Sequence, residues 1–167
     1  MKNFFLVPVL LLTFILSGCF SDPVQDDLLV YLNEELADIS HLENEALTAY
    51  ESVTGPNYTS DQELYETLTF QVIPAYQEFA DKLEDIKVET EELREIHEGY
   101  IDGVNLQYNA FVTVVTALDE LDPGKIEEAN AMLNEARTLM RDFNDNIEQL
   151  AEEHDVRLTE PVDDFTL

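Results

Sequence analysis

The chain is poor in cysteine and in basic residues, and each shortage excludes a class of protein. Cys19 is the only cysteine, so no disulfide can form within the chain. The 8 Lys and Arg residues stand against 37 Asp and Glu, which gives a formal net charge of -29. Nucleic acids are polyanions that proteins bind through Lys and Arg, so DNA and RNA are excluded as partners. Anionic lipid headgroups are also expected to repel this surface.

Sequence signatures of common catalytic sites are missing as well. The chain has no Gly-x-Ser-x-Gly, no Gly-rich loop before a lysine and no cysteine besides Cys19. These gaps argue against a serine hydrolase, a phosphate-loop enzyme and a cysteine protease. We therefore expect a protein that is not an enzyme and that carries no cofactor.

The acidity itself has two interpretations. A solvated surface suited to salt or to high external pH is the first, and a surface that binds cations or a basic partner is the second. Paired acids such as Glu91-Glu92 lack the alternating oxygen ligands and central glycine of the common calcium loop. Solvated helix faces are therefore the interpretation we adopt.

Residues 1–18 have the features of an export signal. A short start with Lys2 precedes an apolar stretch, Phe4 to Ile15, that is too short to span a bilayer. The following Leu16-Ser17-Gly18-Cys19 resembles the lipobox of bacterial lipoproteins. The resemblance implies cleavage between Gly18 and Cys19, with a diacylglyceryl group on the Cys19 thiol; the alternative is an ordinary signal peptide with a chance cysteine. Two acyl chains, palmitate being typical, suffice for stable anchoring.

The remaining chain has apolar residues at helical spacing. It predicts four amphipathic helices: Pro23 to Val53, a helix capped by Ser60 that runs to Ile86, a helix capped by Thr90 that runs to Leu121, and Ile126 to His154. We predict an all-α fold, an antiparallel up-down-up-down four-helix bundle. Pro74 is expected to kink the second helix, and two separate helices meeting at Ile73 are the alternative.

The predicted organisation is a removed signal peptide (1–18), the lipidated cysteine with a short tether (19–22), one helical domain (23–158) and an acidic tail (159–167). The topology places the start of the first helix, the joint near Val88 and the tail at the membrane-proximal end. The loops Thr54 to Thr59 and Asp122 to Lys125 are then expected at the distal end, where a partner outside the cell would meet them.

One turn of the third helix holds the candidate binding residues. His97 and Tyr100 lie on the apolar stripe, and Gly99 and Gly103 share one face. One explanation is structural: His97 is a histidine at the edge of the core, and the two glycines allow a neighbouring helix to approach closely. The alternative is that the glycines leave room for a ligand beside His97 and Tyr100. The tyrosines are expected to rim the core with hydroxyls in water, and a groove for sugars or peptides is the alternative. This set comprises Tyr31, Tyr50, Tyr58, Tyr65, Tyr76, Tyr100 and Tyr108.

No metal site is predicted. A di-iron bundle uses Glu-x-x-His on two helices, but Arg94 precedes His97 and Ala151 precedes His154 at that spacing, and only His41 has a carboxylate there. The three histidines are also expected at different heights along the helices.

The lipobox, the helical pattern and the acidity together resemble the small helical lipoproteins of Gram-positive, Bacillus-type bacteria. We therefore expect a lipid-anchored protein on the extracytoplasmic face of the cell membrane. Its predicted role is that of a non-enzymatic helical scaffold that contacts an unknown protein or cell-wall partner. The alternative is a lipoprotein that binds a small ligand or cation between helices near His97 and Tyr100.

Overall fold

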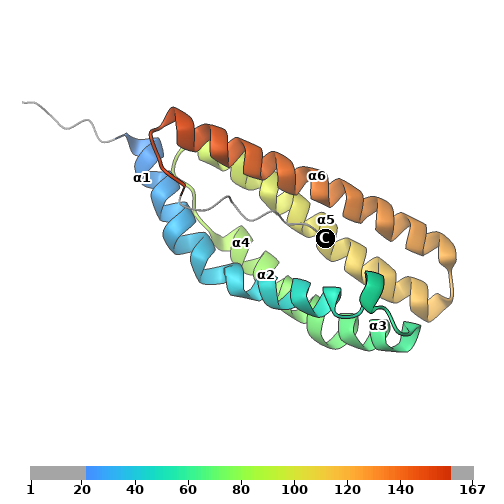
Figure 1. Cartoon of the computed structure of the whole chain (residues 1–167). Coiled ribbons are helices and arrows are strands. Elements are labelled where there is room, and N and C mark those ends of the chain that lie inside the picture. The colour runs from blue at the N-terminus through green and yellow to red at the C-terminus, as the bar shows by residue number, and fades with distance from the viewer. Residues whose placement is uncertain (1–21, 159–167) are drawn as a thin grey trace, which may run out of the picture.

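The computed structural model describes residues 22–158, and this part of the chain is all helical, with no strand. The signal peptide, Gly18, Cys19 and the tail of residues 159–167 lie outside the described residues. The helical elements, in chain order, are α1 (Pro23–Val30), η1 (Tyr31–Glu35), α2 (Leu36–Glu51), η2 (Gly55–Asn57), α3 (Asp61–Thr67), η3 (Leu68–Val72), α4 (Ile73–Asp85), α5 (Glu91–Glu120) and α6 (Pro123–Glu153) (Figure 1).

The first three predicted helices begin where expected, but α6 begins at Pro123, three residues before the predicted Ile126, and Asp122 caps it. Asp22 accepts hydrogen bonds from the backbone N–H groups of Val24 and Gln25, with Pro23 in the first helical position. Ser60 accepts from the backbone N–H of Glu63 at 3.2 Å. Thr90 occupies the cap position of α5 but makes no capping bond, because its hydroxyl donates to Asp27 instead.

Two turns of π-helix, η1 and η3, interrupt otherwise α-helical segments. Because η3 joins α3 to α4 with helical backbone on both sides, the chain from Asp61 to Asp85 is one continuous helical segment rather than two helices meeting at Ile73. Pro74 is the second residue of α4, one residue beyond the end of η3, and its missing N–H leaves a gap in the hydrogen-bond ladder at this level. The wider π turn is where the helix accommodates the proline.

The long helices lie side by side around one core (Figure 1). α5 packs on α6, α2 packs on α4, and α4 and α1 each pack on α5. The heptad pattern of the last helix is confirmed from Ala129 to Leu150, where its stripe is buried, while Ile126 at the start is only partly buried. Those buried positions are Ala129, Leu133, Ala136, Met140, Phe143, Ile147 and Leu150. His154 was expected to continue this stripe, but the helix ends at Glu153 and His154 follows it.

The two ends of the molecule hold different parts of the chain. The start of α1, the joint between α4 and α5, and the end of α6 lie together at one end, while the α2–α3 and α5–α6 connections lie at the other (Figure 1). We call these the proximal and the distal end. At the proximal end, Asp27 of α1 accepts hydrogen bonds from the backbone N–H of Thr90 at 2.8 Å and of Glu89 at 3.1 Å, so α1 holds the α4–α5 joint.

Candidate functional site

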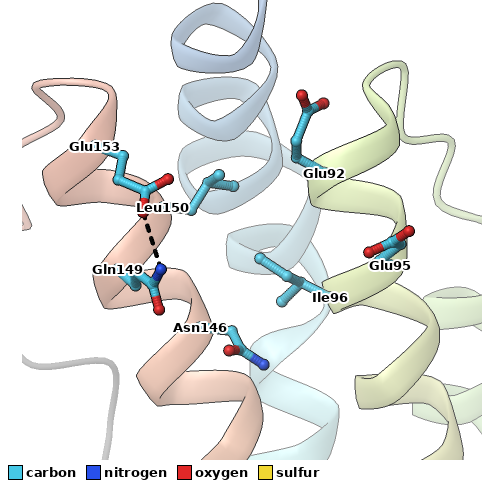
Figure 2. Close-up of a pocket in the computed structure, with 7 residues that line it drawn as sticks. All are labelled: Glu92, Glu95, Ile96, Asn146, Gln149, Leu150 and Glu153. Carbon is cyan, nitrogen blue, oxygen red and sulfur yellow. Dashed lines mark hydrogen bonds between the residues drawn. The ribbon is translucent and has the colours of Figure 1, made fainter.

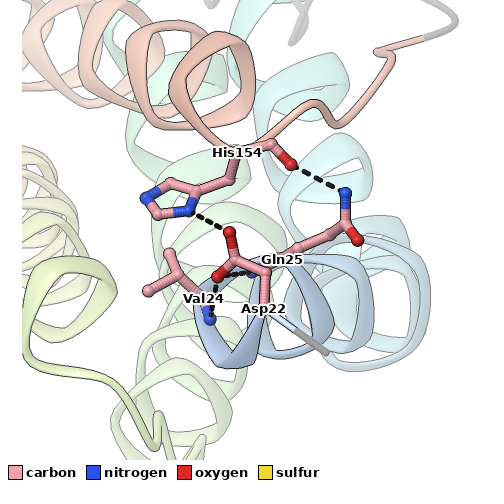
Figure 3. Close-up of polar contacts among 4 residues, drawn as sticks. All are labelled: Asp22, Val24, Gln25 and His154. Carbon is pink, nitrogen blue, oxygen red and sulfur yellow. Dashed lines mark hydrogen bonds and ion pairs between the residues drawn. The ribbon is translucent and has the colours of Figure 1, made fainter. Parts of the chain in front are cut away.

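The proximal end is closed by a clasp between the first and last helices, made by Asp22, Gln25 and His154. The Asp22 carboxylate accepts from His154 Nδ1 at 2.7 Å, and Gln25 Nε2 donates to the His154 carbonyl oxygen at 2.7 Å (Figure 3). The hydrogen bond from His154 lowers the pKa of Asp22, and the backbone N–H groups of Gln25 and Val24 lower it further. The clasp therefore fixes the start of α1 to the end of α6.

An acidic pocket lies near the same end, between α5 and α6. Its polar lining comes from Glu92 and Glu95 of α5 and from Asn146, Gln149 and Glu153 of α6 (Figure 2). Gln149 Nε2 donates to a Glu153 carboxylate oxygen at 2.9 Å, so one of the three carboxylates already has a partner. Among residues 22–158 no three His, Cys, Asp or Glu side chains are arranged to hold a metal ion.

The distal end has an apolar pocket of about 420 Å³ where the two loops expected there meet. Its lining includes Tyr58 and Leu64, the segment from Leu121 to Pro123, and also Leu118 and Ile126. The Tyr58 side chain is half exposed, and its hydroxyl donates to Asp61 at 2.8 Å, which raises the pKa of Tyr58. The lining of this pocket includes neither His97 nor Tyr100, so the structure places Tyr58 in a site separate from theirs.

His97 and Tyr100 are both buried within the core. The Tyr31 hydroxyl lies 3.0 Å from His97 Nδ1, and the Tyr100 hydroxyl donates to Glu43 at 3.2 Å. Burial lowers the pKa of His97, so its neutral form is favoured. His97 Nε2 is buried without a hydrogen-bond partner. This geometry favours a core histidine held by a tyrosine.

The tyrosine prediction is wrong for three members of the set. The side chains of Tyr31, Tyr76 and Tyr100 are buried completely, hydroxyls included, rather than rimming the core in water. The Tyr100 hydroxyl is accommodated there by Glu43, a buried carboxyl group that was not among the predicted site residues, and the Tyr31 hydroxyl by His97. A signal was available, because Glu43 stands four residues after Ile39 and three before Ala46, both on the buried stripe of α2.

Gly99 and Gly103 have different surroundings. A methyl group on Gly103 would stand 3.1 Å from Leu139 Cβ and 3.4 Å from Met140 Cε, so α6 approaches α5 closely there. Nothing lies within 4 Å of the same position on Gly99. Close helix approach therefore explains Gly103 and leaves Gly99 unexplained.

This difference makes the two glycines a matched pair for mutation. Alanine is favoured over glycine in a helix by about 1 kcal/mol, so Gly99→Ala is expected to raise the free energy of unfolding by up to that amount. Gly103→Ala is expected to lose this gain, because α6 must move outward by a few tenths of an ångström. Urea unfolding of both variants measures the difference, and equal stabilities would contradict the packing described for α5 and α6.

Comparison with protein-family models, with curated proteins and with solved structures yields no match. Within residues 22–158, no helix has both the length and the apolar character needed to cross a bilayer. The function must therefore be argued from the chain's own surface.

Proposed function

We propose that this chain is a lipid-anchored extracytoplasmic lipoprotein, a non-enzymatic scaffold that contacts a protein partner through its distal end. In this proposal the helices form an antiparallel up-down-up-down four-helix bundle, a topology supported by the packing of α2 on α4, α4 on α5 and α5 on α6. Lipid on Cys19 would hold the proximal end at the membrane, since Asp22 is only three residues further along the chain. The distal end would then point outward.

The exposure and the backbone conformation of Leu121 are the observations that carry the proposal. It is 84% exposed, and its backbone φ of 55° lies in the left-handed region that normally favours glycine at the end of a helix. A leucine there costs about 1 kcal/mol of backbone strain and leaves a large apolar side chain in water. The left-handed backbone ends α5, with the Asp122 N–H bonded to the Ala117 carbonyl oxygen, but glycine would do this without strain. The exposed leucine side chain adds nothing to the fold and is useful if a partner covers it.

The charges around the pocket indicate the kind of partner. Asp61 and Asp122 line it, and Lys125 is engaged at 2.8 Å by Glu120. The pocket is therefore an apolar surface inside an acidic rim on a strongly acidic molecule. It fits a protein segment that carries an apolar side chain between lysines or arginines, because opposite charges favour encounter and fix orientation.

Leu121→Gly tests the proposal because it separates folding from binding. The free energy of unfolding is expected to rise by about 1 kcal/mol as the strain is relieved, while binding falls. The probe is a short peptide with a central leucine flanked by lysines, titrated into the full chain in detergent micelles. Binding is expected at low ionic strength and should weaken as salt screens the rim.

Two controls sharpen this test. A peptide with glutamates in place of the lysines is expected not to bind. Phe70 of η3 is a different apolar side chain in water, 72% exposed, and lies outside the distal pocket. Phe70→Ser is therefore expected to leave binding unchanged. In intact cells, a photocrosslinker at position 58 should yield a discrete adduct that Leu121→Gly abolishes. Equal binding by Leu121→Gly and the unmodified chain would overturn the proposed contact surface.

A further inference from the structure

Glu43 is a carboxyl group placed in the middle of the core without a counter-ion. It is 4% exposed, and its hydrogen bond comes from the neutral hydroxyl of Tyr100. Within residues 22–158 the ion pairs are Lys125 with Glu120 and His154 with Asp22, and neither involves Glu43. A buried carboxylate with no opposite charge is strongly destabilising, so the group is accommodated best when it is protonated.

The groups that face Glu43 come from each helix packed on this part of α2. α4 contributes Tyr76, whose fully buried hydroxyl has no hydrogen-bond partner, and α5 contributes Tyr100. From η1, Tyr31 interacts with Tyr100 and with His97. From α6, the Phe143 ring stacks on the Tyr100 ring with the two ring centroids 4.1 Å apart. The positive charge of Arg137, also on α6, interacts with Tyr50, which lies further along α2 than Glu43. The surroundings of Glu43 are thus apolar rings and neutral hydroxyls.

We propose that Glu43 is a proton-controlled clamp between α2 and the α4–α5 face of the core. With its carboxyl protonated, the core closes around it; with its carboxyl ionised, α2 loosens from α4 and α5. The device is independent of the distal surface and of how the chain is anchored. Its consequence is a scaffold whose rigidity depends on the pH of its surroundings.

The titration behaviour of the cluster supports this proposal. Burial raises the pKa of Glu43 from 4.5 to about 8, although the Tyr100 hydrogen bond works in the opposite direction. Burial, together with the charge on Glu43, raises the pKa values of Tyr76 and Tyr100 well above the usual range for tyrosine. The tyrosines therefore stay neutral where Glu43 titrates. The lowered pKa of His97 gives an opposite, acid-side effect, since protonating this buried ring is unfavourable.

The direction of the pH effect follows from proton linkage. Between pH 4.5 and about 8, the folded chain holds a proton on Glu43 that the unfolded chain has released. Stability therefore falls as pH rises across this window, and Glu43 causes no further change in stability with pH above it. From pH 6 to pH 9, the folding equilibrium constant is expected to fall by about a hundredfold from this group alone.

The test measures urea unfolding of the full chain, in detergent micelles, from pH 5 to pH 9. Glu43→Gln keeps the shape and the hydrogen-bonding capacity of the protonated acid. The stability of this variant is therefore expected not to show the decline with rising pH that Glu43 causes. Glu45→Gln, an exposed position on the same helix, is the matched control and should retain the decline of the unmodified chain. A pH dependence shared by all three proteins would overturn the proposal, because general repulsion among the acids would then explain it.

A second measurement needs no variant. Carboxyl-carbon NMR of the chain labelled at glutamate is expected to show one glutamate that titrates near pH 8, and hydrogen exchange at α2 amides should accelerate beyond the intrinsic base-catalysed rate in the same range. If every glutamate titrates below pH 6, the clamp does not exist. If one titrates near pH 8 without faster exchange in α2, Glu43 is buried but does not control the packing of this helix.

Discussion

The Leu133→Asp variant is expected to lose its cooperative unfolding transition. Leu133 is buried in the stripe with which α6 faces the core. Shortening a core leucine costs roughly 2–5 kcal/mol, and the new carboxylate would have no partner and no water. Together these costs are comparable with the roughly 5–15 kcal/mol that holds a typical domain together. Circular dichroism during heating is expected to show reduced helix and no sharp transition.

Ala131→Asp provides the control, because Ala131 is exposed on the same helix two residues earlier. It adds the same charge to an already acidic surface and is expected to change stability by less than about 0.5 kcal/mol. If both variants melt like the unmodified chain, α6 is not packed through this face.

Cys19→Ala is expected to abolish lipid attachment entirely. The thiol of Cys19 is the proposed acceptor of the diacylglyceryl group, and alanine offers no nucleophile in its place. Without lipid, electrostatics would not retain the protein, since its net charge of -29 is repelled by anionic headgroups. Metabolic labelling with a radioactive fatty acid followed by membrane fractionation is the measurement, and the variant is expected as unlabelled precursor or in the medium.

Ser21→Ala is the matched control for this experiment. It changes a small residue close to Cys19 and leaves the proposed acceptor intact, so labelling is expected to continue. Label on the Cys19→Ala protein would refute lipidation at this residue and remove the argument for which end of the molecule faces the membrane.

Local chemistry explains how much of the fold could be predicted from the sequence. Asp22 and Ser60 cap their helices as expected because a cap depends on a few neighbouring residues. The π turns could not be anticipated, since each adds a residue to one turn and shifts the apolar stripe. In the first helix, Tyr31 is fully buried and the expected core residue Leu32 only partly so.

The candidate site was predictable only in part for a different reason. The two loops that hold Tyr58 and Asp122 were placed at one end by topology alone, and they share a pocket. His97 and Tyr100 were selected for their place on a stripe, but their partners Tyr31 and Glu43 come from a distant segment of the chain. Helical spacing describes one helix at a time, so it does not reveal which polar groups meet between helices.

The clasp at the proximal end has a mechanical consequence. A pull on a tether attached before Asp22 enters the molecule at a residue that both caps α1 and bonds to His154. The bond between Gln25 and the His154 carbonyl oxygen ties the next part of that turn to the end of α6. A pull at this point therefore loads the end of α6 as well as α1, and α1 is not released from its N-terminus until the bonds to His154 break.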